Sequence, residues 1–286
     1  MKKLLSLLLV VACAFSMVAC SADKDGADTA TVTAKVIEFD LTEEEYAFGV
    51  DKNQPELLTA VNELIAELEE NGKMEELFDT YFGDGTPEGI TSAKKDAAKD
   101  QLIVATNAAF EPFEYMKGDK FCGIDMEIAK LLADKLGKEL VIEHMDFDAV
   151  CLSVGQQQCD IAMAGLTVNT EREEFVTFSD SYYTASQKII VKSTDTTFDN
   201  CADAAAVMEI LNGLKADKKI GVQRGTTGQW FVEGDEDWGF AGFAATCVPY
   251  TNGSLAIQDM LAGNVDYVII DAAPAKAITK AINAMR

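Results

Sequence analysis

The chain has 286 residues, of which 24 are basic and 48 acidic, so its formal charge at pH 7 is −24. A surface with this excess of negative charge excludes nucleic acid and anionic membranes as general binding partners. The length is sufficient for two domains of ordinary size.

The N-terminus has the pattern of an export signal. Two lysines follow Met1, and an apolar run extends to Ala19, which is typical of a secretory signal peptide at residues 1–19. The run is too short for a transmembrane helix. Met17-Val18-Ala19-Cys20 resembles a bacterial lipobox, which implies a lipid on Cys20 and a flexible tether at 20–34; the alternative is an ordinary signal with an incidental cysteine. We therefore expect an extracytoplasmic protein, anchored to the cell membrane by lipid, at the cell surface or in the periplasm.

The mature chain offers little for metal or cofactor binding. Removing residues 1–19 takes away two basic residues and no acidic ones, which makes the charge −26. His144 is the only histidine and no CxxC motif occurs, so we expect no metal site and no cofactor. Five cysteines remain after Cys20, and their odd number leaves at least one unpaired without assigning the pairs: Cys122, Cys151, Cys159, Cys201 and Cys247.

From residue 101 onward, short β-rich runs alternate with helical patterns. We expect strands at 102–106, 140–142, 160–164, 188–191, 220–222 and 267–270, with helices at 125–137, 147–156, 203–214 and 254–261. Asp125 is expected to cap the first of these helices. Strands alternating with helices predict an α/β fold with parallel sheets covered on both faces.

The preceding part of the chain has a different pattern. Strands are expected at 35–39 and 46–50, and Pro55 begins a helix with one apolar stripe that ends at Asn71-Gly72. A short helix then ends at Phe82. Residues 83–100 are rich in Gly, Ser, Thr, Asp and Lys without periodicity, which predicts a linker.

Candidate binding residues follow the strands, because ligands of open α/β sheets bind beyond the carboxyl ends of strands. Arg172 is at an unfavourable position for a cation. Thr170 and Glu173 have capping-box spacing, which places this cation in the first turn of a helix, where the macrodipole disfavours it. A guanidinium there suits a ligand carboxylate; the alternative is a surface arginine paired with neighbouring glutamates.

The other candidates have plain structural alternatives. The turn Gly225-Thr226-Thr227-Gly228 could hold an anion or simply begin a helix. Asp271 could meet an ammonium, although helix capping is the more frequent role of such a residue. Phe110 and Phe147 are core residues or ligand contacts. An enzymatic function has little support, because the chain has one histidine and neither a GxSxG elbow nor a P-loop. Acid–base catalysis by a pair of acidic residues stays open.

Several separated motifs resemble one family. Residues 105–115, 123–129, 164–172 and 178–183 are similar to type 2 (family 3) extracellular solute-binding proteins of polar amino acid ABC transporters. The resemblance implies a periplasmic-binding-protein type 2 fold, in which two parallel-sheet-based lobes joined by a two-segment hinge close on a ligand. It also implies a non-enzymatic binder that acts as a monomer with a membrane ABC permease.

The order of the motifs departs from the family. Residues 41–83 resemble the usual C-terminal end, yet they precede the usual beginning, which indicates a circular permutation. We then expect a contiguous lobe 1 at 49–184, in which the linker 83–100 joins the ancestral termini. Lobe 2 would be assembled from 35–48 plus 185–286, with Lys35 near Arg286.

The resemblance also implies roles for ten residues. Arg172 would bind the ligand α-carboxylate and Asp271 its α-ammonium, while Asn107 would help select the side chain. The seven remaining contacts are Phe110, Phe147, Gly165, Thr167, Gln223, Thr226 and Thr227. Asn107 stands where cation-binding relatives often have an acid, and Ile270 is apolar, so we expect a neutral or polar amino acid, with cystine among the candidates. The alternatives are a dehydratase-like enzyme, a ligand sensor, or a lipoprotein for a peptide or adhesion partner.

Overall fold

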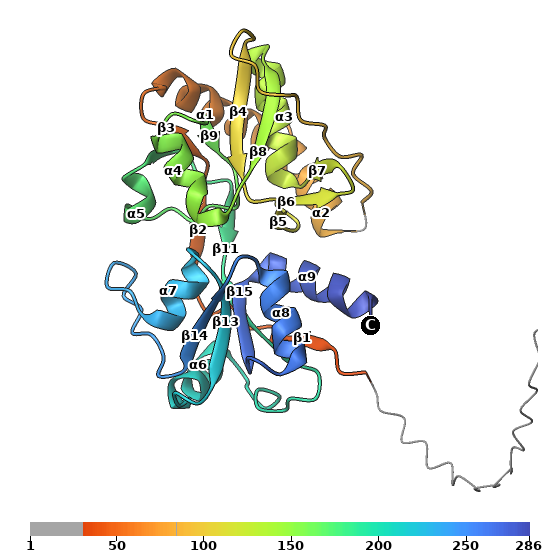
Figure 1. Cartoon of the computed structure of the whole chain (residues 1–286), viewed down its shortest axis with the longest axis vertical. Coiled ribbons are helices and arrows are strands. Elements are labelled where there is room, and N and C mark those ends of the chain that lie inside the picture. Colours follow the sequence, from red (N-terminus) through yellow and green to blue (C-terminus); the bar gives the residue numbers. More distant parts are fainter. Residues whose placement is uncertain (1–30, 84) are drawn as a thin grey trace, which may run out of the picture. The chain divides into compact units, whose positions relative to one another are not determined.

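The computed structural model describes residues 31–286 except residue 84 (Figure 1). The predicted signal peptide, Cys20 and residues 20–30 of the predicted tether therefore lie outside the described residues. Within the described part, no helix is both long and apolar enough to cross a membrane.

The first sheet, with the helices around it, is called lobe 1 from here on. Its strand order is β10-β3-β9-β4-β8. The strands are β3 (Gly49–Asp51), β4 (Gln101–Thr106), β8 (Glu139–His144), β9 (Ile161–Ala162) and β10 (Val176–Phe178). The helices are α1 (Pro55–Glu70), α2 (Lys73–Phe82), α3 (Ile124–Leu136), α4 (Val150–Gly155) and α5 (Thr170–Glu173). A small sheet of β5 (Ala109–Phe110), β6 (Glu114–Lys117) and β7 (Lys120–Cys122) lies beside α3.

The second sheet, with its helices, is called lobe 2. Its strand order is β1-β12-β15-β13-β14. The strands are β1 (Ala34–Val36), β12 (Gln187–Lys192), β13 (Lys219–Gln223), β14 (Thr246–Tyr250) and β15 (Tyr267–Asp271). The helices are α6 (Ala204–Gly213), α7 (Thr227–Glu233), α8 (Gly253–Ala262) and α9 (Ala272–Ala284).

Both sheets are mixed rather than wholly parallel. In lobe 1, β4 pairs in parallel with β8 and β9, whereas β3 and β10 are antiparallel additions. In lobe 2, β13 pairs in parallel with β14 and β15, whereas β12 and β1 are antiparallel. The βα units supply the parallel core of each sheet. β3 and β12 run opposite to that core, and the edge strands β10 and β1, antiparallel to them, run in its direction again.

The chain passes between the two sheets as a pair of strands. β2 (Glu44–Tyr46) and β11 (Tyr183–Ala185) are hydrogen-bonded in antiparallel register, with Tyr46 opposite Tyr183. In Figure 1 this pair lies between the upper and lower bodies. Tyr46 is fully buried there, against the ring of Phe113 at 5.1 Å between centroids. The junction is therefore a packed structure rather than a loose connection.

Some predicted elements differ from the observed ones. The strand expected at 35–39 is Ala34–Val36, the strand expected at 160–164 is only Ile161–Ala162, and the helix expected at 147–156 begins with a 3-10 turn at Phe147–Ala149. The prediction that Asp125 caps α3 is wrong, because Gly123 holds the cap position. The Asp125 carboxylate instead accepts hydrogen bonds from the Gly165 amide and the Tyr182 hydroxyl.

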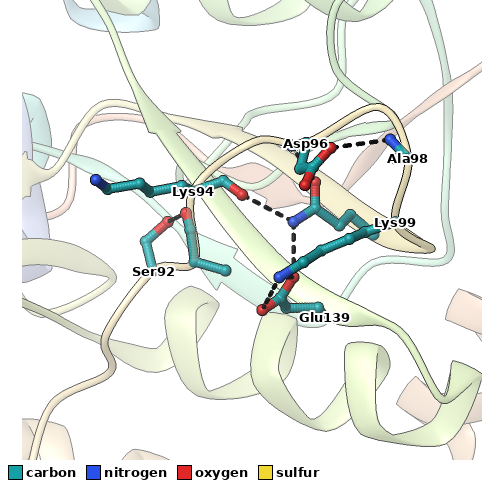
Figure 2. A network of polar contacts seen from close by, with 8 residues as sticks. Ser92, Lys94, Asp96, Ala98, Lys99 and Glu139 are labelled. Atoms are coloured by element: carbon teal, nitrogen blue, oxygen red, sulfur yellow. Dashed lines mark hydrogen bonds and ion pairs between the residues drawn. The ribbon is translucent and has the colours of Figure 1, made fainter.

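The predicted linker has little regular structure, but it is fixed to lobe 1 by hydrogen bonds (Figure 2). Gln101 donates to the Lys94 carbonyl at 2.9 Å and to Glu139 at 2.8 Å, and Lys99 contacts the same carboxylate at 3.0 Å. The Ser92 hydroxyl accepts from the Ile142 amide of β8 at 2.8 Å. Composition predicted the absence of helix and strand but not this attachment, which depends on partners 38 to 50 residues away.

The two ends of the described fold lie together. Asn283 of α9 exchanges two hydrogen bonds with the backbone of Ala34, at 2.9 and 2.8 Å, and Arg286 donates to the Val32 carbonyl at 3.0 Å. Adjacent ends are what a permuted chain requires. The permuted order and the lobe boundaries nevertheless stay predictions.

The permutation can be tested by reversing it. We expect a chain that joins Arg286 to Thr33 through a short glycine-rich linker, and that begins at Thr91 and ends at Phe82, to fold and bind the same ligand. Circular dichroism, thermal unfolding and ligand titration would compare it with the native order. The matched control opens the chain between Leu102 and Ile103 inside β4, which should not fold. A rejoined chain that is unfolded would contradict the prediction.

Candidate functional site

Arg172 lies in the first turn of α5 and is buried, at 7% exposure. The prediction that Thr170 caps this helix is wrong. The cap is Asn169, whose side chain accepts a hydrogen bond from the Arg172 amide at 2.7 Å. The guanidinium donates to the Thr167 carbonyl at 2.6 Å and, across the lobes, to the Gly225 carbonyl at 3.1 Å. Backbone carbonyls from both lobes therefore fix its orientation.

The charge of Arg172 has no ionic partner in the described part of the protein. Among the described residues, no carboxylate oxygen lies within 4.0 Å of the guanidinium. The guanidinium lies over the rings of Phe147 and Trp230, at 5.1 and 5.3 Å from their centroids. Burial lowers the pKa of Arg172 from its ordinary value. A buried cation without an ionic partner can bind an anion from outside the chain. The alternative interpretation, a surface arginine paired with neighbouring glutamates, is wrong.

Asp271 ends β15 and is buried, at 4% exposure. It occupies the cap position of α9 but makes no side-chain capping bond. Its Oδ2 instead accepts a short hydrogen bond from the Tyr46 hydroxyl, and its pKa is raised to about 7, first by burial and then by the charge of Glu44. The described residues place no cation within 4.0 Å of this carboxylate. The Asp271 side chain therefore does not cap α9, contrary to the more frequent role of such a residue.

Glu44 is a buried acid that the sequence analysis missed. It is 2% exposed in β2 and accepts hydrogen bonds from Gln187 and Thr167, each at 2.9 Å. It is the middle one of three consecutive glutamates, a run that suggests only a solvated segment. The available signal was strand alternation, which puts Glu44 on the same face as Tyr46.

Phe110, Gly165 and Thr167 form one wall of the site. A side chain on Gly165 would lie 3.0 Å from the Phe110 ring, and its φ of +53° favours glycine, so close packing and backbone geometry both fix this residue. Phe110 is 5% exposed. The Thr167 hydroxyl donates to Glu44, and its backbone pairs with Tyr46 through an isolated bridge.

Asn107 and Gln223 meet across the two lobes. Gln223 Nε2 donates to Asn107 Oδ1 at 3.4 Å, while Asn107 Nδ2 donates to the Met145 carbonyl at 2.6 Å. The other Gln223 side-chain atom, Oε1, is buried and has no partner among the described residues. These two amides therefore connect the lobes and leave one buried oxygen, Gln223 Oε1, without a partner in the described part of the chain.

The turn before α7 supplies the last two candidates. Thr226 holds the cap position of α7, and its hydroxyl donates to the Gln223 carbonyl at 2.8 Å. The Thr227 hydroxyl is buried and makes no hydrogen bond within the described part of the chain. The strand-to-helix turn was predicted correctly, and the free hydroxyl of Thr227 is a polar group available to a ligand.

The cysteines of the described residues form no disulfide. The five cysteines of the described chain are all free thiols: Cys122, Cys151, Cys159, Cys201 and Cys247. Within the same residues, no group of three or more His, Cys, Asp or Glu side chains is arranged to hold a metal ion.

Two mixed α/β lobes joined by paired strands, with a buried guanidinium from one and a buried carboxylate from the other at their junction, define a two-lobed solute-binding protein. The family model of "Bacterial extracellular solute-binding proteins, family 3" matches residues 102–237. An ancestral arginine-binding protein bound to arginine is 33% identical, with a TM-score of 0.54 over 64% of this chain and 75% of that one. The chain belongs to this family of extracellular solute-binding proteins.

Further relatives share parts of the chain. The arginine-binding extracellular protein ArtP of Bacillus subtilis is 36% identical over 138 residues, which is 48% of this chain and 49% of ArtP. The lysine/arginine/ornithine-binding periplasmic protein of Escherichia coli is 26% identical over 63% of this chain and 65% of its own length. Holo ArgBP from T. maritima is 31% identical, with a TM-score of 0.53 and coverage of 64% and 75%. The match thus spans about half to two thirds of these curated relatives.

Proposed function

We propose that the protein captures a free amino acid between its two lobes and delivers it to a membrane ABC importer. One observation carries the proposal: Arg172 in lobe 1 and Asp271 in lobe 2 are buried, oppositely charged and without ionic partners among the described residues. An amino acid carries the complementary pair of charges on adjacent atoms. Each lobe would then bind one end of the ligand, so that binding favours the closed arrangement.

The proposed contacts follow from the atoms that are free. Arg172 would bind the α-carboxylate, supported by the Thr226–Thr227 turn with its unpartnered hydroxyl. Asp271 would bind the α-ammonium through Oδ1, since Oδ2 already accepts from Tyr46. The Gly165 carbonyl and the Thr167 oxygen would accept from the same ammonium.

The aromatic and amide residues would surround the ligand side chain. Phe110 and Phe147 would flank it, and Asn107 and Gln223 would meet its tip. None of these four carries a formal charge, which favours a neutral or polar amino acid, cystine included. This specificity stays a prediction. The relatives named above bind arginine, or lysine, arginine and ornithine, by their names, so cationic amino acids are equal candidates.

Other parts of the proposal rest on the N-terminal sequence and on the family. Anchoring through a lipid on Cys20, docking to an ABC permease and a monomeric state stay predictions, and so does an extracytoplasmic location for this chain. The relatives support that location, because their names describe extracellular or periplasmic proteins.

A second function, a dehydratase-like enzyme, has two observations in its favour. A solved structure that is 30% identical, with a TM-score of 0.54, is described as an amino acid-binding protein ancestral to cyclohexadienyl dehydratase. Asp125 and Asp271 have pKa values raised to about 7, as a general acid would need. The relatives are named as binding proteins, so we rank binding first. Recovery of the ligand unchanged after prolonged incubation would separate the two functions.

The test of binding is a thermal-shift screen of the purified mature protein against the twenty amino acids, ornithine and cystine. A ligand at a hundred times its Kd adds about 2.7 kcal/mol to the free energy of unfolding by mass action. We therefore expect the melting temperature to rise by several degrees with at least one amino acid. N-acetylated and amidated forms of the same ligand serve as controls, because they lack the ammonium or the carboxylate. No response to any amino acid would contradict the proposal.

A further inference from the structure

Glu44 lies beside the proposed ammonium site, and the function proposed above does not use it. Its Oε1 accepts from Thr42 Oγ1 at 2.7 Å and Gln187 Nε2 at 2.9 Å, and its Oε2 accepts from Thr167 Oγ1 at 2.9 Å. All three donors are neutral, and the described residues provide no cationic nitrogen within 4.0 Å of the carboxylate. A buried anion surrounded only by neutral donors is costly unless a cation arrives from outside.

The hydrogen bond from Thr167 determines what this residue can bind. A threonine hydroxyl has one proton and two acceptor lone pairs. Because Thr167 donates that proton to Glu44, only acceptor capacity remains on its oxygen. An ammonium has donors and no acceptor, so it fits this oxygen, whereas a ligand carboxylate does not. Glu44 therefore decides which end of an amino acid Thr167 can contact.

Glu44 is also joined to Asp271 through Gln187. Gln187 lies opposite Asp271 in the register of β12 and β15, and its side chain donates a hydrogen bond to the Glu44 carboxylate. The charge of Glu44 contributes to the raised pKa of Asp271, which places the two acids within electrostatic reach. The same two acids act on Arg172. With all three groups ionised, the buried cluster has two negative charges and one positive charge.

We propose that Glu44 is a positioning residue that holds Thr167 as an acceptor for the ligand ammonium and, with Asp271, favours ligands of net positive charge. A zwitterionic amino acid leaves one negative charge of the cluster unbalanced, whereas a cationic amino acid balances it. The inference rests on the proposed function, and it departs from the neutral ligand expected from Asn107 and Ile270.

The experiment compares Glu44→Gln with Glu45→Gln, the same change at an exposed neighbour. Isothermal titration at pH 8 measures arginine, glutamine and glutamate, which share a backbone and differ in net charge. Loss of a hydrogen bond to a charged group predicts about tenfold weaker arginine binding by Glu44→Gln. Glutamine binding should weaken less, so that the ratio of the arginine affinity to the glutamine affinity is smaller in the variant than in the wild type. Glu45→Gln should match the wild type.

Thermal unfolding of the ligand-free variants separates recognition from structure. The glutamine at position 44 keeps the shape and removes an uncompensated buried charge, so the melting temperature should stay the same or rise while affinity falls. A purely structural Glu44 would lose stability and would leave the arginine-to-glutamine ratio unchanged, which overturns the inference.

A second variant keeps the test independent of how Glu44→Gln folds. Thr167→Val removes the hydroxyl with little change in volume, and it should weaken binding as well. The double variant should lose less affinity than the product of the two single losses, because Glu44 acts through Thr167. A fully multiplicative loss would overturn the positioning role, and wild-type preference for glutamine or glutamate would overturn the charge preference. A wild type that binds no amino acid would instead refute the proposed function.

Discussion

Replacing Arg172 with alanine should weaken amino acid binding by about 3 to 5 kcal/mol, which is a factor of at least about a hundred in Kd. The guanidinium is buried and already oriented by the carbonyls of Thr167 and Gly225. In the variant, the ligand carboxylate would be buried without a cationic partner. Isothermal titration with the amino acid found by the thermal-shift screen measures the loss.

Two comparisons make this result specific. Arg286→Ala removes another arginine, which is exposed and whose guanidinium donates to the Val32 carbonyl. The Kd of this variant should stay within about twofold of the wild type. An amidated ligand, which has no carboxylate, should lose little of its weak binding when Arg172 is replaced. Unchanged affinity of Arg172→Ala for the free amino acid would refute the proposed role.

Asp271→Asn should cost about 2 to 5 kcal/mol in ligand binding and should also remove a pH dependence. The pKa of Asp271 is about 7 in the ligand-free protein. A ligand ammonium needs the ionised carboxylate, so wild-type affinity should fall as pH decreases below about 7, approaching tenfold per pH unit. The variant keeps the shape of the side chain but has no proton to lose, so its weaker affinity should stay flat through this range.

The same group predicts the pH dependence of stability without ligand. The folded-state pKa of Asp271 is raised above its ordinary value of 3.8, so the folded state holds more protons than the unfolded state between about pH 4 and 7. Its contribution to the free energy of unfolding is fully present below this range and is lost as pH rises through about 7. Asp125, with a pKa of about 7, acts in the same direction.

Thermal unfolding at pH 5.5 and 8 checks the sign. The ligand-free wild type should melt at the higher temperature at pH 5.5, and Asp271→Asn should reduce that difference. Asp119→Asn is the matched control, since it makes the same change at an exposed position. A wild type that is more stable at pH 8 than at pH 5.5, or an unchanged pH dependence in Asp271→Asn, would contradict the assignment.

Local patterns predicted the elements that depend on periodicity. The helix from Pro55 was expected to end at Asn71-Gly72, and α1 does end at Glu70, with its apolar stripe buried. β4 and α3 are also close to their predicted bounds. These elements can be predicted because a helix or strand with one buried face needs apolar side chains at regular spacing along a short segment of sequence.

Predictions that needed a distant partner were less accurate. Asp125 was assigned to a helix cap, yet its carboxylate meets an amide 40 residues away and a hydroxyl 57 residues away. Thr170 was taken as a cap because its spacing suited a capping box, but Asn169 is in the extended conformation that a cap requires. Local spacing offers several equivalent candidates, and only the observed backbone conformation selects one.

The candidate site was found in part. The position of Arg172 in the first turn of α5 was visible in the sequence, because a cation there is locally unfavourable. Glu44 was not, because acidic residues in a run look alike until strand pairing turns one of them inward. Its neighbours Thr167 and Gln187 are 123 and 143 residues away along the chain.

The sequence by itself determined the charge of the chain, its alternating α/β elements, the strand-end candidates and the family resemblance, since these depend on composition and on neighbours in sequence. Only the tertiary structure decided that Arg172, Asp271 and Glu44 are buried without ionic partners in the described chain. The reason is physical: the electrostatic cost of a charge depends on its distance from solvent and from other charges, and folding sets both.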